Sequence, residues 1–193
     1  MDPLHRSRSR SHRRSAALFF AVGLAVAGAA WAQSLDAARS RVSATFRQMG
    51  VPVEATFKTF RAQVAFDAAK PADARASVEI DTASIDLGDA EMNAEVRKKP
   101  WFDTATHPKA TFVGSGARPA GGNRFEVPGK LTIKGRTLDV VAPVTVRTEG
   151  NAQIFEGQVP IKRLAFNVGE GEWKDTSMVA DDVVVRFRIV TVR

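Results

Sequence analysis

The sequence contains no cysteine and no tyrosine, and it has only three histidines. The lack of cysteine excludes a disulfide, a thiolate nucleophile, a thiolate metal ligand and a lipid attached through cysteine. If the chain is exported to an oxidising compartment, its fold must therefore rely on an apolar core alone.

A long apolar run is also missing. The uncharged stretch 16–30 follows five arginines in residues 6–14 and is shorter than the roughly 20 residues of a membrane-spanning helix. Ala30-Trp31-Ala32 has the small-x-small pattern of a signal-peptidase site. We expect residues 1–32 to be a signal peptide cleaved after Ala32, and the mature chain 33–193 to be secreted and periplasmic. An uncleaved anchoring helix is the alternative, and Arg13-Arg14 leaves twin-arginine export open beside ordinary unfolded export.

An excess of charge of one sign is absent once this leader is set aside. The leader holds five of the 28 basic residues and one of the 21 acidic ones, so the mature part has a net charge of +3. Its basic residues are scattered among acids, without the runs and interleaved aromatics of nucleic-acid platforms. Nucleic acid is therefore not an expected partner.

Alternation with a period of two dominates the mature sequence and predicts half-buried strands. The strongest example runs from Arg124 to Lys134, where Phe125 and Leu131 share one face with Ile133 and lysines occupy the other. The other predicted strands begin near Ser40 and cover 53–58, 64–66, 77–81, 138–146, 155–161 and 183–189. Breaks at 49–52 and 70–73 and the reversal at 134–136 are predicted turns.

One segment departs from this pattern. Residues 89–99 have acidic residues early, Arg97 and two lysines late, and Pro100 as a stop, which predicts one short helix. Together these elements predict an all-β fold: a single extended, antiparallel, lipocalin-like β-barrel of about eight strands with one helix. A closed barrel is favoured over a sandwich because closure removes exposed strand edges.

Residues able to support catalysis are few. His107 is the only histidine of the mature part, and we expect it to pack or hydrogen-bond in a loop. Turn formation and helix capping account for the local density of carboxylates more simply than acid-base chemistry or a cation site. Those carboxylates are Asp81, Asp86, Asp89, Glu91 and Glu95. The stretch 169–173 bears glycines but lacks a phosphate-binding pattern and is expected to be a loop. We therefore predict no enzyme, no metal and no cofactor.

A series of motifs follows in order along the chain, at residues 81–91, 101–103, 107–112, 129–135, 142–144, 166–169 and 182–185. Together they resemble the YceI-like family, whose members are described as periplasmic polyisoprenoid or lipid binders. The sequence departs from the family pattern at Leu87, at Met92, Asn93 and Glu95 in the helix, and at Asn167. The resemblance implies an extended barrel that holds a long isoprenoid tail, with transient membrane contact during transfer. A quinone, a quinone precursor and a polyprenyl phosphate all fit this expectation, and no oligomeric state is predicted.

The candidate lipid-binding residues are the inward-facing apolar ones. They are Phe46, Phe57, Val78, Ile80, Phe112, Phe125, Leu131, Ile133, Phe155, Ile161, Val185 and Phe187. Trp101 and Phe102 directly follow the helix stop and are the candidate cavity mouth. Two alternatives stay open: an interaction or stress barrel with a filled core, and an enzyme on an apolar substrate that uses His107 and the 81–95 carboxylates.

Overall fold

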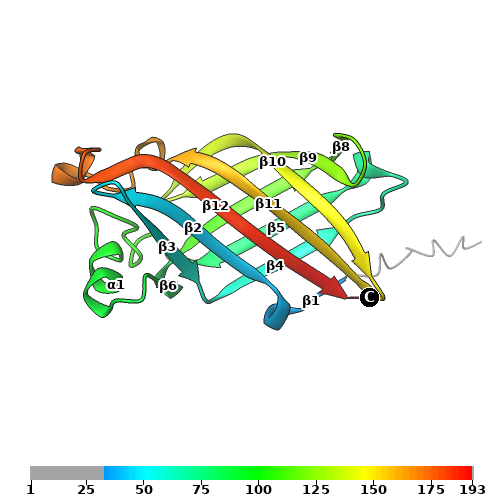
Figure 1. Ribbon diagram of the computed structural model, residues 1–193, viewed down its shortest axis with the longest axis horizontal. Helices are drawn as coiled ribbons and strands as arrows, with labels where there is room; N and C mark the ends of the chain where they lie inside the picture. The colour runs from blue at the N-terminus through cyan, green and yellow to red at the C-terminus, as the bar shows by residue number, and fades with distance from the viewer. Residues whose placement is uncertain (1–32, 193) are drawn as a thin grey trace, which may run out of the picture. The chain divides into compact units, whose positions relative to one another are not determined.

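The computed structural model describes residues 33–192, which form one curled antiparallel sheet (Figure 1). The predicted leader and its cleavage site lie outside the described residues. The strands are β1 (Ser34–Leu35), β2 (Arg41–Gln48), β3 (Val51–Phe57), β4 (Phe60–Ala65), β5 (Arg75–Asp81), β6 (Ile85–Asp86), β7 (Lys109–Ser115), β8 (Arg118–Pro119), β9 (Arg124–Ile133), β10 (Arg136–Glu149), β11 (Ala152–Lys162) and β12 (Val179–Val192). The helices are α1 (Ala90–Val96) and the short 3-10 helices η1 (Ala37–Arg39), η2 (Pro71–Asp73), η3 (Thr82–Ser84), η4 (Arg163–Phe166) and η5 (Gly171–Lys174).

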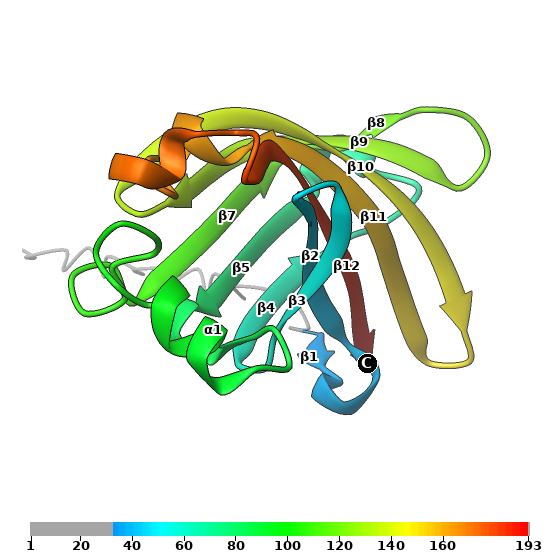
Figure 2. The same cartoon turned by 60° about the vertical axis from the view of Figure 1, so that its left-hand side comes forward.

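The strand order is β4-β5-β7-β9-β10-β11-β12-β2-β3-β6, and β1 and β8 add to β12 and β9. Every pairing is antiparallel, and the β9–β10 and β11–β12 ladders carry the longest registers. The sheet curls until β4 comes round towards β3, to which the chain joins it through Lys58 and Thr59 (Figure 2). The predicted all-β, barrel-like fold with one α-helix is thereby confirmed, but the described residues form twelve strands rather than about eight, and β4 does not pair with β3 or β6 to close the sheet.

Two ends of this barrel differ in what covers them (Figure 1). One end, here called the capped end, carries α1, the loop 97–108 and the segment 163–178. The opposite end, called the far end, carries β8, η2 and the turn between β10 and β11. Strand β9 connects the two, because Phe125 packs in the far-end cluster and Ile133 packs in the capped-end cluster.

The sequence pattern missed strand β7. Only Phe112 on this strand is a large inward-facing residue, since Gly114 also faces inward and Val113 is exposed on the outer face. A strand with one bulky inward residue gives almost no alternation signal. It is nevertheless central to the sheet, paired with β5 on one side and β9 on the other.

The predicted turn at 49–52 is too long. The reversal needs only Met49 and Gly50, both with positive φ as in the two-residue turns that suit a β-hairpin, so Val51 and Pro52 belong to β3. Proline fits there because β3 pairs only with β2 at that level. The predicted reversal at 134–136 is confirmed, with Lys134 and Gly135 at positive φ.

The predicted helix is also too long. Helix α1 starts where expected, because the Asp89 carboxylate caps the amide of Met92, but it ends at Val96. The Val96 carbonyl accepts its hydrogen bond from the amide of Phe102 at 3.0 Å. The chain therefore leaves the helix before the lysines and turns back, which brings Trp101 and Phe102 to the barrel.

Candidate functional site

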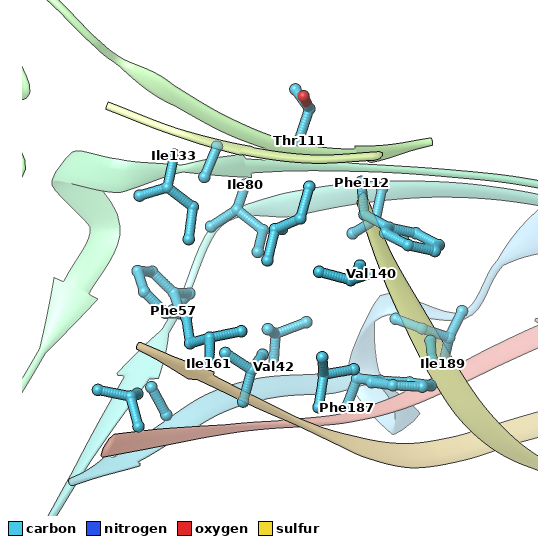
Figure 3. Close-up of a pocket in the computed structure, with 18 of the residues that line it drawn as sticks. Val42, Phe57, Ile80, Thr111, Phe112, Ile133, Val140, Ile161, Phe187 and Ile189 are labelled. Carbon is cyan, nitrogen blue, oxygen red and sulfur yellow. The ribbon is translucent and has the colours of Figure 1, made fainter. Parts of the chain in front are cut away.

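The inside of the barrel is not filled. It holds a cavity of about 230 Å³, called the lumen below, and 40 residues line it. All of these are apolar or aromatic except Arg75, Thr111 and Arg163. Figure 3 shows Ile80 and Ile133 facing Val42 and Ile161 across this space. The lumen can therefore accept an apolar molecule but offers it few polar contacts.

All twelve candidate lipid-binding residues lie on the lumen wall. Four of them are buried, whereas eight face inward and still keep accessible surface. The buried four are Phe57, Phe125, Ile133 and Phe155, and the partly accessible eight are Phe46, Val78, Ile80, Phe112, Leu131, Ile161, Val185 and Phe187. Because an inward side chain in a filled core would lose nearly all its accessible surface, these eight line open space.

Sequence reasoning left out other members of the wall. Most are small or β-branched residues on the same strand faces, and their alternation with outward neighbours was the available signal. Among them are Val42, Ala44, Ala55, Val127, Val140, Ala142, Val144, Val159 and Ile189. Arg163 was also missed, although it stands two positions after inward-facing Ile161.

Glycines let two aromatic rings lie flat against the wall. A Cβ on Gly129 would come within 2.6 Å of the Phe112 ring, and one on Gly114 would be 2.9 Å from it. In the same way, a Cβ on Gly157 would be 2.6 Å from the ring of Phe187, its cross-strand partner. The missing side chains thus make room for rings that would otherwise project into the lumen.

Aromatic side chains pack together at the far end of the lumen. The ring of Phe66 makes edge-to-face contacts with Phe125 and Phe155, at centroid distances of 5.0 and 5.8 Å. Ala74 and Ala117 are buried beside Phe125. Backbone hydrogen bonds hold the connecting loops, such as Gly116 N–H to the Ala74 carbonyl at 2.9 Å.

The candidate mouth residues lie in the lumen wall at the capped end. Trp101 is only 8% exposed, and its indole packs on Trp173 with ring centroids 5.1 Å apart. Phe102 is partly buried and meets Phe57 edge to face at 6.2 Å. Both residues therefore contribute to the wall beneath α1, as well as to the cover over this end.

Arg163 fixes the capped end through main-chain carbonyls. It is 3% exposed, and its five N–H groups donate to five carbonyl oxygens at 2.6–3.2 Å. Those acceptors belong to Val168, Gly169, Trp173, Val179 and Ala180. Burial lowers the pKa of Arg163, partly offset by the charge of Asp181, but a guanidinium stays protonated at neutral pH.

Lys134 is a second buried cation at this end. From the β9–β10 turn its Nζ donates to the carbonyls of Lys99 and Asn167, both at 2.8 Å, and to the Glu170 carboxylate at 2.7 Å. This hydrogen bond holds the pKa of Glu170 below its usual value. Lys134 therefore ties the loop after α1 to the segment after η4. Asn167 adopts the left-handed conformation there, which asparagine tolerates better than most residues.

The carboxylates of 81–95 mostly organise the chain around α1. Asp81, Asp86 and Asp89 each accept a backbone N–H two or three residues further on, and Asn93 donates to Asp86 while accepting from the amide of Leu87. Hydrogen bonds from Lys58 first, then Asn93 and Gly88, lower the pKa of Asp86. Glu95 pairs with Lys98 on the surface.

His107 has structural contacts in its loop. Its amide donates to the Asp103 carbonyl, its own carbonyl accepts from the Thr82 hydroxyl, and its ring packs against Gly135. Within residues 33–192, no three histidine or acidic side chains gather as a metal-binding group. None of the helices in that range is long and apolar enough to cross a membrane.

The sequence matches the YceI-like domain family over residues 33–191. A UPF0312 protein of Azotobacter vinelandii is 33% identical over 119 residues, covering 58% of this chain and 62% of that relative. A UPF0312 protein of Pseudomonas savastanoi pv. phaseolicola is 35% identical over 51% of either chain. The chain thus spans about half to two thirds of the length of these relatives. Protein YceI of Escherichia coli O157:H7 is 29% identical over 79% of this chain and 83% of its own.

Solved structures share the fold. BcnA of Burkholderia cenocepacia is 56% identical, with a TM-score of 0.80 over 81% of this chain and 99% of that one. A polyisoprenoid binding domain from Saccharophagus degradans, implicated in plant cell wall breakdown, has a TM-score of 0.67 at 19% identity, over 82% of this chain and 97% of its own. That second similarity shows the fold alone. The family match covers nearly all the described residues, and the chain belongs to the YceI-like family.

Proposed function

We propose that this protein binds and carries a long-chain isoprenoid lipid, of the polyisoprenoid or isoprenoid quinone type, in its lumen. The apolar lining carries the proposal, because 37 of the 40 residues around the cavity are apolar or aromatic. The fold shared with a polyisoprenoid binding domain supports an isoprenoid cargo.

A long isoprenoid tail needs more room than the lumen offers in this structure, so its binding requires side chains of the wall to move. The lumen volume of about 230 Å³ exceeds the roughly 150 Å³ of an engineered cavity that takes up benzene, but falls below the ~300 Å³ of a small ligand pocket. A tail of some 40 carbons would gain a gross ~30 kcal/mol on leaving water. In a bilayer the tail is already shielded from water, so the net free energy of transfer from the bilayer to the lumen is far smaller. A small net free energy suits reversible carriage.

The proposed place of action is the periplasm. The arginine-rich start, the apolar run 16–30 and the site after Ala32 support export with removal of residues 1–32. The family match begins at residue 33, next to the proposed cleavage site. Determining the N-terminus of protein isolated from the periplasm tests this part: an intact leader on periplasmic protein would contradict it.

We infer that transfer involves brief contact with a membrane through the β2–β3 turn. Met49 is 70% exposed, Val51 is also exposed, and the Met49 amide donates to the carbonyl of Met178, a third exposed apolar residue. Three exposed apolar side chains at one site are unfavourable in water unless a partner covers them. Met49→Asp should slow lipid transfer from vesicles, whereas Val113→Asp, on the outer face of β7, should not. Equal rates for both variants would contradict this contact.

The open lumen favours carriage over an interaction barrel with a filled core. A filled core would leave no cavity and no accessible surface on eight inward residues. The proposal assigns no reaction to the chain, since Asp81, Asp86 and Asp89 cap turns and His107 packs in its loop.

A neighbouring pair of valines gives the sharpest test. Val140 lines the lumen, whereas Val141 is 49% exposed on the outer face of the same strand. Protein isolated gently from its native periplasm is extracted with organic solvent, and the extract is analysed by mass spectrometry. We expect a stoichiometric isoprenoid with the parent and Val141→Asp, and none with Val140→Asp.

Fold integrity is monitored by circular dichroism. If Val140→Asp does not fold, Val140→Phe replaces it, because the larger side chain fills the lumen without burying a charge. An empty extract from folded parent protein, or full lipid content in a folded Val140 variant, would contradict the proposal.

A further inference from the structure

The indole N–H of Trp101 is a buried donor without a partner in the lumen wall. Among buried side-chain nitrogen and oxygen atoms in the described residues, only Trp101 Nε1 has no hydrogen-bond partner. Buried polar groups are nearly always paired, so such an atom calls for an explanation. Trp101 lines the lumen, and its ring corner Cζ3, remote from Nε1, would lie 3.2 Å from a Cβ on Gly169. Nε1 itself is buried, so a ligand in the lumen reaches it only when a neighbouring side chain of the wall moves.

We propose that Trp101 Nε1 donates a hydrogen bond to an uncharged acceptor oxygen, of the ketone or quinone-carbonyl class, at the head of the lipid. This proposal rests on the proposed function and deepens it. It places the head of the cargo at the capped end, next to Trp101, and the tail along the lumen towards Phe125.

The surroundings of Trp101 favour an acceptor that arrives on an apolar body. A buried water generally needs two to four polar partners. The side chains of the lining supply few polar partners near Trp101, because all five N–H groups of Arg163 already donate hydrogen bonds to carbonyls. A carbonyl oxygen on a lipid needs only the single donor that Trp101 supplies.

The nearby charge has the sign that suits such an oxygen. The Arg163 guanidinium carbon lies 5.5 Å from the centroid of the Trp101 ring, and the nearest carboxylate acting on this charge is that of Asp181, which does not pair with it directly. The positive potential of the guanidinium, acting in a poorly hydrated site, favours the negative end of a carbonyl dipole. An ionised phosphate would lose its hydration and find one free donor, which disfavours an anionic head.

Three probes with similar tails separate the head groups. They are farnesylacetone, the hydrocarbon in which its carbonyl is replaced by a methylene, and farnesyl phosphate. We expect the wild-type protein to bind the ketone about two- to tenfold more tightly than the hydrocarbon, the range of a net neutral hydrogen bond. In Trp101→Phe this ratio should fall to about one. Trp173→Phe is the matched control, because Trp173 packs on Trp101 but does not line the lumen. The ratio of ketone to hydrocarbon affinity in this variant should equal that of the wild-type protein.

A spectroscopic readout on the unmodified protein covers the case in which Trp101→Phe does not fold. In a spectrum of ¹⁵N-labelled protein, the Trp101 indole proton should shift downfield with the ketone and not with the hydrocarbon. Equal affinity for the two probes with no downfield shift would overturn the Trp101 assignment and leave the carrier proposal standing. Tighter binding of farnesyl phosphate with a shift at Trp101 would overturn the uncharged head, and failure of all three probes to bind would reject the carrier proposal itself.

Discussion

The two ends of the barrel are stabilised by different interactions. At the capped end two almost fully buried cations, Arg163 and Lys134, bind carbonyls of the loop 97–108, of the segment 163–178 and of the start of β12. At the far end, Ala74, Ala117 and Phe125 pack beside backbone hydrogen bonds, and no buried charge is involved. A buried cation with fixed acceptors specifies one geometry, whereas small apolar contacts tolerate rearrangement. The capped end is thus built to hold a fixed group, such as the indole of Trp101.

The largest effect should come from Arg163→Met. In the parent protein five carbonyls accept hydrogen bonds from this guanidinium, and the change leaves them without that donor. Each buried unpaired acceptor costs ~1 kcal/mol or more. We expect a loss of about 4 kcal/mol or more in the free energy of unfolding, measured by urea denaturation. Arg75→Met, at an exposed position on the far-end side of the lumen, should change it by less than ~0.5 kcal/mol. Similar losses for both variants would remove the contrast between the ends.

A smaller loss is expected for Lys134→Met. Its Nζ has two carbonyls and a carboxylate as close acceptors, so removing it should cost about 2–3 kcal/mol in unfolding free energy. Lys130→Met, on the strand that leads into the turn of Lys134, is the control, because the exposed Lys130–Asp139 ion pair contributes at most ~1 kcal/mol. Proteolysis should cut the loop 97–108 faster in the Lys134 variant, and an unchanged cutting rate would contradict its role as a tie between loops.

The sequence predicted the barrel wall well and the capped end poorly, for a physical reason. Alternation records which side of a strand faces the core, so Phe125, Leu131 and Ile133 were placed on the lumen wall from sequence alone. The same pattern cannot separate a filled core from an open one, because both need apolar inward faces. The hydrogen bonds of Arg163 and Lys134 to main-chain carbonyls join residues up to 35 positions apart, and carbonyl positions leave no mark in the sequence.

Between the ends, Gly114 offers a way to narrow the lumen. A Cβ there would lie 2.8 Å from Val127 Cγ1 and 2.9 Å from the Phe112 ring, so Gly114→Ala should push side chains inward. We expect binding of a long isoprenoid to weaken about tenfold, equivalent to ~1.4 kcal/mol of overpacking, while short probes bind nearly as before. Adding Phe112→Ala should restore the long ligand. If the double variant binds no better than Gly114→Ala, the ring does not set the width of the lumen.

The smallest effect should be a pH dependence at the capped end. Contacts with Lys58, Asn93 and Gly88 lower the pKa of Asp86 in the folded protein. For a carboxylate with a lowered folded pKa, the stabilisation is present above the unfolded value near ~4 and is lost as the pH falls through the folded pKa. Asp86→Asn should therefore reduce stability more at pH 7 than at pH 2, so that the stability of the variant depends less on pH than that of the parent. Equal losses at both pH values would show that Asp86 acts through its shape and neutral hydrogen bonds, and that its charge contributes nothing to holding the segment before α1.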